Sequence, residues 1–197
     1  MAEELETKVE NVEAASQTEN KKEAKGRKPR RENRRPEKVS DGLEKRMVSL
    51  NPISKVTKGG KTLRYDALMV VGDKNGKVGI GLAKALDVTQ AIEKATLVAK
   101  KHMINVCIEG TTIPHDIIGK FGTTKVIMMP SKEGKGIIAG GAVRDVVELA
   151  GIKDITTKLY GSNNPVNCVK ATFEGLKALR TAEQIAALRG KKVEEIR

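Results

Sequence analysis

Two neighbouring segments of the chain place an apolar side chain at every second position, and a turn sequence separates them. The apolar positions are Leu63, Tyr65, Ala67, Met69 and Val71 in the first segment and Val78, Ile80 and Leu82 in the second. A period of two residues is typical of a β-strand with one buried face. The intervening Asp73-Lys74-Asn75-Gly76 contains Asn-Gly, a pair that adopts the positive φ angles of tight hairpins. The sequence therefore predicts two antiparallel strands joined by a hairpin.

A further strand and a helix flank this hairpin. Residues 47–57 are strand-like, although Pro52 and a broken alternation after Leu50 predict an edge strand or a bulge. Beyond the third strand, Asp87 with Gln90 three residues later has the spacing of a helix capping box. Three strands packed on one helix predict a small α+β domain over residues 43–108.

The pattern of strands and helices restarts in the second half of the chain. The expected elements are strands over 111–118 and 123–129, a helix from about Ile138 to Ala150, a strand over 152–160, a helix capped by Asn164 with Pro165 at its first position, and a short helix capped by Thr181 with Gln184. They predict a second α+β domain over residues 109–180 and a helical tail over 181–197.

Residues 1–42 differ from the rest, because they are acidic at first, basic afterwards and poor in apolar side chains. Such a segment cannot bury enough apolar surface to offset the entropy lost on ordering it. We therefore expect a disordered arm. Its basic half is a candidate for contacts with RNA phosphates, and a solubilising tail without a defined site is an equally open alternative.

The charge balance narrows the choice of partner. The chain has 37 Lys and Arg against 25 Asp and Glu, which gives a net charge of +12. This excess favours nucleic acid first and an anionic membrane surface second. Aromatic residues make up only 2% of the chain, whereas proteins that read unpaired bases usually offer aromatic rings for stacking. We therefore expect RNA recognition through phosphate charge and helix shape.

Several other classes of function find no support in the sequence. Cys107 and Cys168 lie far apart and complete no metal-ligand pattern, so no metal, cofactor or disulfide is expected. No nucleophile with its base, no signal peptide and no membrane-spanning apolar run is found. The sequence predicts a cytosolic, non-enzymatic protein with no membrane association and no small-molecule substrate.

Two glycine-containing segments imitate nucleotide-binding loops. Gly60-Lys61-Thr62 matches the end of a P-loop, but a strand is expected after it where a helix is required. Residues 134–139 fit G-x-G-x-x-A and are followed by Asp154, although a dinucleotide site would need further βαβ units. The glycine amides could instead hold another anion at a helix N-terminus, or allow close packing of helix on sheet.

Basic residues gather around a turn between the first two expected strands. The cluster consists of Lys55, Lys58, Gly59, Gly60, Lys61 and Arg64. Glycine lets the backbone approach a surface closely, and a basic hairpin tip can enter a groove between RNA segments. The alternative is an ordinary turn whose lysines protect an edge strand from pairing. We expect these residues to contact RNA.

Four segments carry a resemblance to a known family. They are Asn51–Lys61 (NPISKVTKGGK), Val70–Gly81 (VVGDKNGKVGIG), Gly136–Arg144 (GIIAGGAVR) and Tyr160–Val166 (YGSNNPV). In order and spacing they resemble the bacterial small-subunit ribosomal protein five family, over residues 43–195. The resemblance implies two small α+β domains: an N-terminal one like the double-stranded-RNA-binding fold, and a C-terminal one with a left-handed βαβ crossover.

The resemblance also implies a function. The family is a structural constituent of the small ribosomal subunit that binds its ribosomal RNA near the decoding region and the place where messenger RNA enters, and it contributes to subunit assembly and translational accuracy. The basic hairpin is expected close to the decoding-site RNA. By position, Gly136 and Arg144 fall where the family meets ribosomal protein four, and the tail from Thr181 falls where it meets ribosomal protein eight.

The chain departs from the family pattern at four positions. Pro52 and Lys61 stand where the family commonly has Arg, Leu82 stands where Tyr is common, and Thr89 stands where Pro is common. Lys61 offers a point charge in place of a bidentate guanidinium contact. These departures bear on individual RNA contacts and leave the family assignment unchanged.

Overall fold

The computed structural model describes residues 42–192 and residue 195, and the predicted arm lies outside them except for Gly42. Residues 42–192 belong to one compact unit. Its described elements are two four-stranded sheets and the helices α2 to α5, which confirms the predicted α+β class. The predicted division of this unit between residues 108 and 109 stays a prediction.

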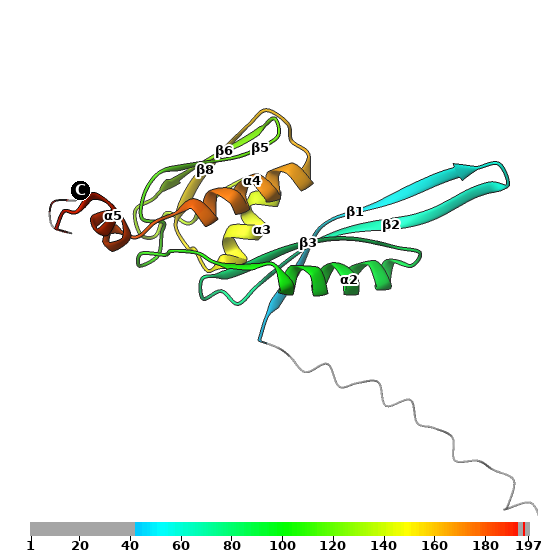
Figure 1. Cartoon of the computed structure of the whole chain (residues 1–197), viewed down its shortest axis with the longest axis horizontal. Coiled ribbons are helices and arrows are strands. Elements are labelled where there is room, and N and C mark those ends of the chain that lie inside the picture. The colour runs from blue at the N-terminus through cyan, green and yellow to red at the C-terminus, as the bar shows by residue number, and fades with distance from the viewer. Residues whose placement is uncertain (1–41, 193–194, 196–197) are drawn as a thin grey trace, which may run out of the picture. The chain divides into compact units, whose positions relative to one another are not determined.

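The first sheet has the strand order β1-β2-β3-β4 and is antiparallel throughout (Figure 1). Its strands are β1 (Glu44–Thr57), β2 (Gly60–Gly72), β3 (Lys77–Ala85) and β4 (Met103–Asn105), of which the short β4 was not predicted. Ala67 and Met69 of β2 pack with α2 (Val88–Lys101), while Leu68 and Val70 point to the other side. Both faces of β2 are thus buried along its inner half.

The irregularity predicted for the first strand is present, but it lies earlier in the chain. The register between β1 and β2 shifts between Met47 and Ser49, so the bulge precedes Leu50. Pro52 lies in an edge strand, as predicted, where its missing N–H interrupts no second ladder.

The turn between β2 and β3 differs from the predicted Asn-Gly turn. Positive φ angles occur at Lys74 and Gly76, and the Asp73 carboxylate accepts hydrogen bonds from the amides of Asn75 and Lys77. The cause is tertiary, because the Lys74 and Gly76 amides donate to the last carbonyls of a helix, α3 (Gly141–Ala150). The turn therefore caps the C-terminal end of that helix.

The second sheet has the strand order β5-β6-β8-β7. Its strands are β5 (Ile117–Phe121), β6 (Thr124–Pro130), β7 (Ile137–Ile138) and β8 (Ile155–Tyr160). The short β7 runs parallel to β8, and α3 connects them as a βαβ unit. The other pairs are antiparallel, and α4 (Pro165–Ala178) covers β5 and β6.

Three predicted boundaries in this half were wrong. Residues 111–116 are not a strand, because the Thr111 carbonyl accepts hydrogen bonds from the Lys153 and Asp154 amides and holds this segment as a loop. Gly119, expected in the turn after the first of these strands, lies inside β5 and pairs with Val126. Glycine fits here because a Cβ would meet the Ala171 carbonyl oxygen of α4 at 2.1 Å. The predicted helix from Ile138 begins at Gly141, because Ile138 pairs with Thr156 in the sheet.

The predicted helix starts were more accurate where a cap is local. The Asn164 side chain accepts from the Val166 amide at the start of α4, and Thr181 forms a full capping box with Gln184 at the start of α5 (Ala182–Arg189). Asp87 precedes α2 as predicted, but its carboxylate accepts from the Gln90 side-chain amide and caps no backbone group.

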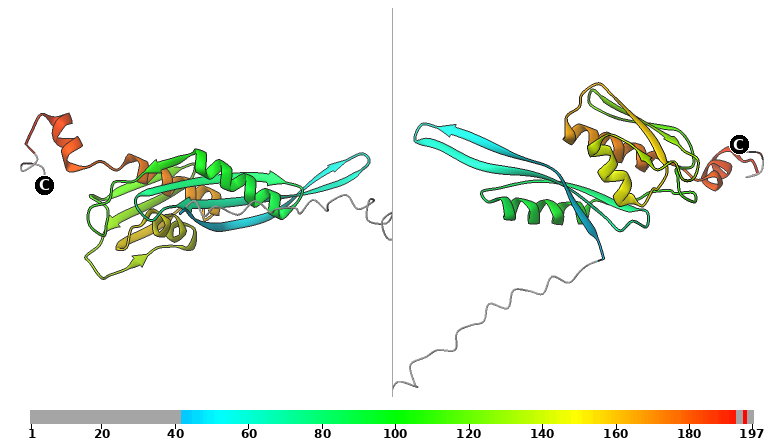
Figure 2. Two further views of the ribbon diagram at one scale, coloured as in Figure 1. Left: turned by 90° about the horizontal axis from the view of Figure 1, so that it is seen from below. Right: turned by 180° about the vertical axis from the view of Figure 1, so that it is seen from behind.

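Helix α3 lies between the two sheets, as Figures 1 and 2 show. Its Val146 and Val147 are fully buried in one core with Val70 and Val78 of the first sheet and Val126 of the second. A smaller core between α2 and the opposite face of the first sheet is built mainly of alanine, including Ala91 and Ala95. Among the described helices, none combines the length and apolar character needed to cross a bilayer.

Candidate nucleic-acid interface

The outer part of the β1–β2 hairpin extends beyond the end of α2 (Figures 1 and 2). From residue 54 to residue 64 every side chain is exposed, including Val56 at 75% and Leu63 at 48%. The strands remain paired to the tip, where Thr57 opposes Gly60. The hairpin is thus an ordered, two-sided projection that no other described element covers.

The register of the hairpin assigns its cations to faces. Lys55 opposes Thr62 and Ile53 opposes Arg64, so Lys55 and Arg64 share the face that points away from α2. Lys61 opposes Val56 and lies on the other face. Lys58 is in the turn itself. The sequence-predicted cluster is therefore brought together at one tip, but its charges point in at least two directions.

The two glycines of the turn differ in backbone conformation, since Gly60 has a positive φ angle and Gly59 does not. Gly60 has a φ of +153°, and the Thr57 hydroxyl donates to its carbonyl oxygen at 3.2 Å. A Cβ built at Gly59 or Gly60 would meet no atom within 4 Å. Packing inside the chain therefore does not require glycine here, and the bare backbone is left free to approach an external surface.

None of Lys55, Lys58, Lys61 and Arg64 forms an ion pair within residues 42–192. One further cation, Lys84 of β3, was missed from the sequence. It opposes Asp66, and the register places it on the same face as Lys55 and Arg64. Only the strand register could have identified it, because Lys84 lies 20 residues beyond Arg64 in the sequence. This face is predominantly positive, with Asp66 as its acidic member.

The loop that imitates a dinucleotide-binding loop holds an anion of its own. The Asp154 carboxylate is only 4% exposed and accepts a 2.8 Å hydrogen bond from the Gly136 amide. This hydrogen bond is the main reason that the pKa of Asp154 lies below its ordinary value. The loop also ends in β7 and not in a helix. The expectation of bare amides at a helix N-terminus was therefore wrong, because a buried side chain occupies them.

Arg144, predicted to face a neighbouring protein, is exposed on α3. It lines a shallow hollow of about 560 Å³ together with Lys74, Glu148, Ile152 and Lys153, among other residues. Gly136 lies in the preceding loop with a φ of +78° and is fixed by Asp154. The structure thus gives Arg144 an accessible setting, whereas Gly136 has a conformational role.

Glu148, also on α3, makes a bidentate contact with Arg46 of β1. The two N–H···O distances are 2.7 and 2.9 Å, and Arg46 also lies 3.0 Å from Asp145. These hydrogen bonds raise the pKa of Arg46 above its ordinary value and lower the pKa of Glu148. The contact joins the edge of the first sheet to α3.

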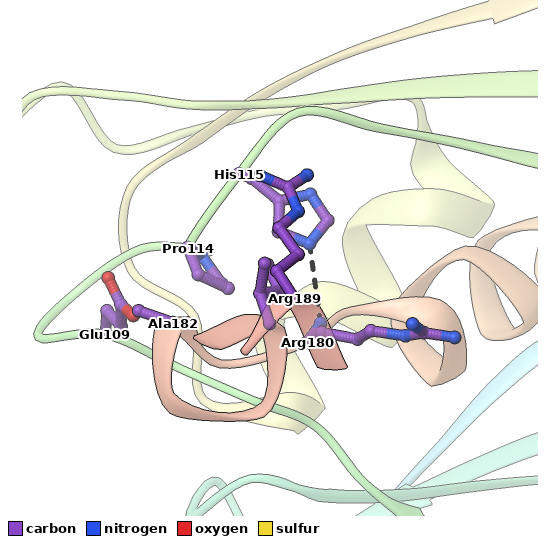
Figure 3. A pocket seen from close by; sticks show the side chains of 7 residues that line it. Glu109, Pro114, His115, Arg180, Ala182 and Arg189 are labelled. Atoms are coloured by element: carbon purple, nitrogen blue, oxygen red, sulfur yellow. Dashed lines mark hydrogen bonds between the residues drawn. The ribbon is translucent and has the colours of Figure 1, made fainter. Parts of the chain in front are cut away.

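A second hollow lies between α5 and the loop before β5 (Figure 3). It measures about 500 Å³, and its lining includes His115, Arg180, Arg189 and Glu109. The Arg180 amide donates to Nε2 of His115 at 3.4 Å, and Nδ1 of the same ring lies 3.0 Å from the Asp116 carbonyl oxygen. Two arginines and one glutamate line this hollow, so the arginines outnumber its acidic residue.

The described residues hold no group of three or more His, Cys, Asp or Glu side chains that could bind a metal ion. Comparison with known families identifies two matches. Residues 43–107 match the model of ribosomal protein S5, N-terminal domain, and residues 119–189 match that of ribosomal protein S5, C-terminal domain. The first match contains the basic hairpin, and the second contains Gly136, Arg144 and the whole of α5.

Proposed function

We propose, because the chain belongs to the ribosomal protein S5 family, that its basic hairpin anchors small-subunit ribosomal RNA near the decoding region. Members of this family are structural, non-enzymatic components of the small ribosomal subunit that bind ribosomal RNA, so the chain acts in translation within cytoplasmic ribosomes. To this family-level function we add the residues that bind the RNA, the region of the RNA that they contact, and contributions to subunit assembly and translational accuracy.

The hairpin's exposed and unpaired cations are the observation that supports this proposal. Lys55 and Arg64 on one face, Lys61 on the other and Lys58 at the tip allow the projection to contact phosphates of two RNA segments at once. Lys84 extends the positive face toward the body of the first sheet. The contact is one of charge and shape, since Tyr65, the aromatic residue next to Arg64 in the chain, is half-buried against the α2 core.

The test is the salt dependence of binding to small-subunit RNA. Replacing Lys58→Glu together with Lys61→Glu should weaken binding and reduce the slope of log affinity against log salt by roughly 2, because each neutralised phosphate contributes about 0.7–0.9. Lys132→Glu together with Lys135→Glu is the matched control, with the same spacing and charge change in another exposed loop. Equal effects of both pairs, or a flat salt response of the wild type, would refute the hairpin anchor.

Two surfaces of the chain are candidates for contacts with other ribosomal proteins. We propose that Arg144 on α3 contacts ribosomal protein four and that α5, with the arginine-lined hollow beside it, contacts ribosomal protein eight. Both surfaces are exposed and offer cations to an acidic partner group. Arg144→Ala should weaken association with protein four while leaving RNA affinity near the wild-type value. Arg189→Ala should weaken association with protein eight and likewise leave RNA affinity near the wild-type value. Loss of RNA binding in either variant would reassign that surface to RNA.

A further inference from the structure

The face of the second sheet that points away from α3 and α4 is open. Val126 and Met128 of β6 are fully buried on the helix side, and their neighbours Lys125, Ile127 and Met129 point to the other side. Figure 1 shows α3 and α4 on the same side of this sheet. No described element covers the opposite side.

Paired strands arrange the side chains of this open face in rows. Lys120, Lys125 and Tyr160 are direct partners across β5, β6 and β8, and they form one row. Ile118, Ile127 and Lys158 form the next row. The first row and the two isoleucines together line a shallow hollow of about 360 Å³. An aromatic ring, aliphatic side chains and lysines therefore meet in one depression.

The charged side chains on this face are all positive. None of the residues in strands β5, β6, β7 and β8 is acidic. Lys120, Lys125 and Lys158 form no ion pair within the described residues. The Tyr160 side chain is 52% exposed and Ile118 is 53% exposed, so both an aromatic surface and aliphatic surface are accessible. The backbone behind Tyr160 is fixed, because Gly161 packs against the Thr123 carbonyl with a φ of +85°.

We propose that the open face of the second sheet binds an unpaired segment of RNA, with a base stacked on Tyr160 and phosphates near Lys120, Lys125 and Lys158. Stacking on an aromatic ring of an open sheet is a general mode of single-strand recognition, and flanking lysines supply the charge. A protein partner is less well matched, because buried protein interfaces are depleted in lysine. This site is separate from the hairpin, and it adds base stacking to the charge-and-shape recognition expected from the low aromatic content.

Tyrosine fluorescence gives a direct test in the full chain. The chain has two tyrosines and no tryptophan, so Tyr65→Phe leaves Tyr160 as the only strong emitter. The background also carries Lys58→Glu and Lys61→Glu, which removes the hairpin tip as a competing site. Titration with a short oligouridine RNA should quench Tyr160 emission saturably. Absence of quenching while the RNA is bound would overturn the stacking assignment.

Variants of the open face then test the site itself. Tyr160→Ala should weaken oligouridine binding roughly fivefold to a hundredfold, the value of one base–aromatic stack, whereas Tyr160→Phe should change it by less than about twofold. Replacing Lys120, Lys125 and Lys158 by Gln should reduce the salt slope by roughly 2. The matched control replaces the exposed Lys77, Lys153 and Lys177 by Gln.

The same variants, with the hairpin intact, should bind duplex RNA as the wild type does, which separates this proposal from the hairpin anchor. Wild-type oligouridine affinity in both Tyr160→Ala and the open-face lysine variant would overturn the proposal. That result would indicate that the open face binds a protein partner and not RNA. A loss in the control lysine variant equal to that in the open-face variant would also overturn it, because net charge alone would then explain the binding.

Discussion

The carboxylate of Asp154 accepts a 2.8 Å hydrogen bond from the backbone amide of Gly136, in the loop that imitates a nucleotide-binding loop. Asp154 lies at the start of the segment leading into β8, and Gly136 directly precedes β7. The Ile155 amide in turn donates to the Gly136 carbonyl at 3.3 Å. The loop is therefore a closed structural unit of the βαβ connection, and its glycines serve the protein's own carboxylate.

Asp154→Ala should destabilise the fold, because the amides that donate to this buried carboxylate lose their acceptor. We expect a fall of several degrees in Tm, measured by circular dichroism. Glu133→Ala is the matched control, since Glu133 is an exposed acid in the same loop and should leave Tm nearly unchanged. An unchanged Tm in Asp154→Ala would show that the loop is held by other contacts.

The stability of the fold should fall in acid. The pKa of Asp154 is lowered chiefly by the Gly136 amide, and the pKa of Glu148 is lowered chiefly by Arg46. A carboxyl whose pKa is lower in the folded state contributes stability above its unfolded pKa and loses it as pH falls through the folded pKa. Tm should therefore drop as pH falls below about 4, the usual range of carboxyl pKa values.

Asp154→Asn should flatten this acid-side dependence, because it removes one of the two titrations. Glu148→Gln should flatten it separately. The measurement is Tm as a function of pH for the three proteins. Parallel curves for wild type and both variants would show that other carboxyls govern the acid transition.

The contact between Arg46 and Glu148 should contribute only modestly to stability. Their side chains are 37% and 38% exposed, so solvent screens the bidentate pair. A double-mutant cycle with Arg46→Met and Glu148→Gln, followed by urea unfolding, should give a coupling energy of about 0.5–1 kcal/mol. Arg46→Lys should recover part of it, since one charge remains but the paired N–H geometry is lost. A coupling energy near zero would mean that this ion pair adds nothing to the backbone hydrogen bonds and apolar packing that hold the first sheet against α3.

The close approach of β2 to α3 should tolerate no added side-chain atom. A Cβ at Gly72 would lie 2.2 Å from the Leu149 carbonyl oxygen, so Gly72→Ala should destabilise the fold by about 1–3 kcal/mol, measured by urea unfolding. Gly59→Ala is the matched control, because a Cβ there meets no atom within 4 Å. If both substitutions had equal effects, the predicted clash would be relieved by a local shift of the backbone.

Local patterns in the sequence determined much of this protein. Alternation over residues 63–71 and 78–82 predicted β2 and β3, and the capping residues Asn164 and Thr181 marked the starts of α4 and α5. The basic cluster around Gly59 was found because its members lie within ten residues of one another. Each of these features is set by neighbours in the chain, so the chain sequence alone specifies it.

The tertiary structure alone decided the features that depend on distant residues. Ile138 joins the sheet because Thr156 lies beside it, Lys84 joins the positive face through strand register, and Tyr160 meets Lys125 only across paired strands. The turn predicted from Asn-Gly takes another conformation because it caps α3. In each case the deciding partner is far away in sequence, and only the packed chain brings its hydrogen bonds, apolar surface and charge into contact.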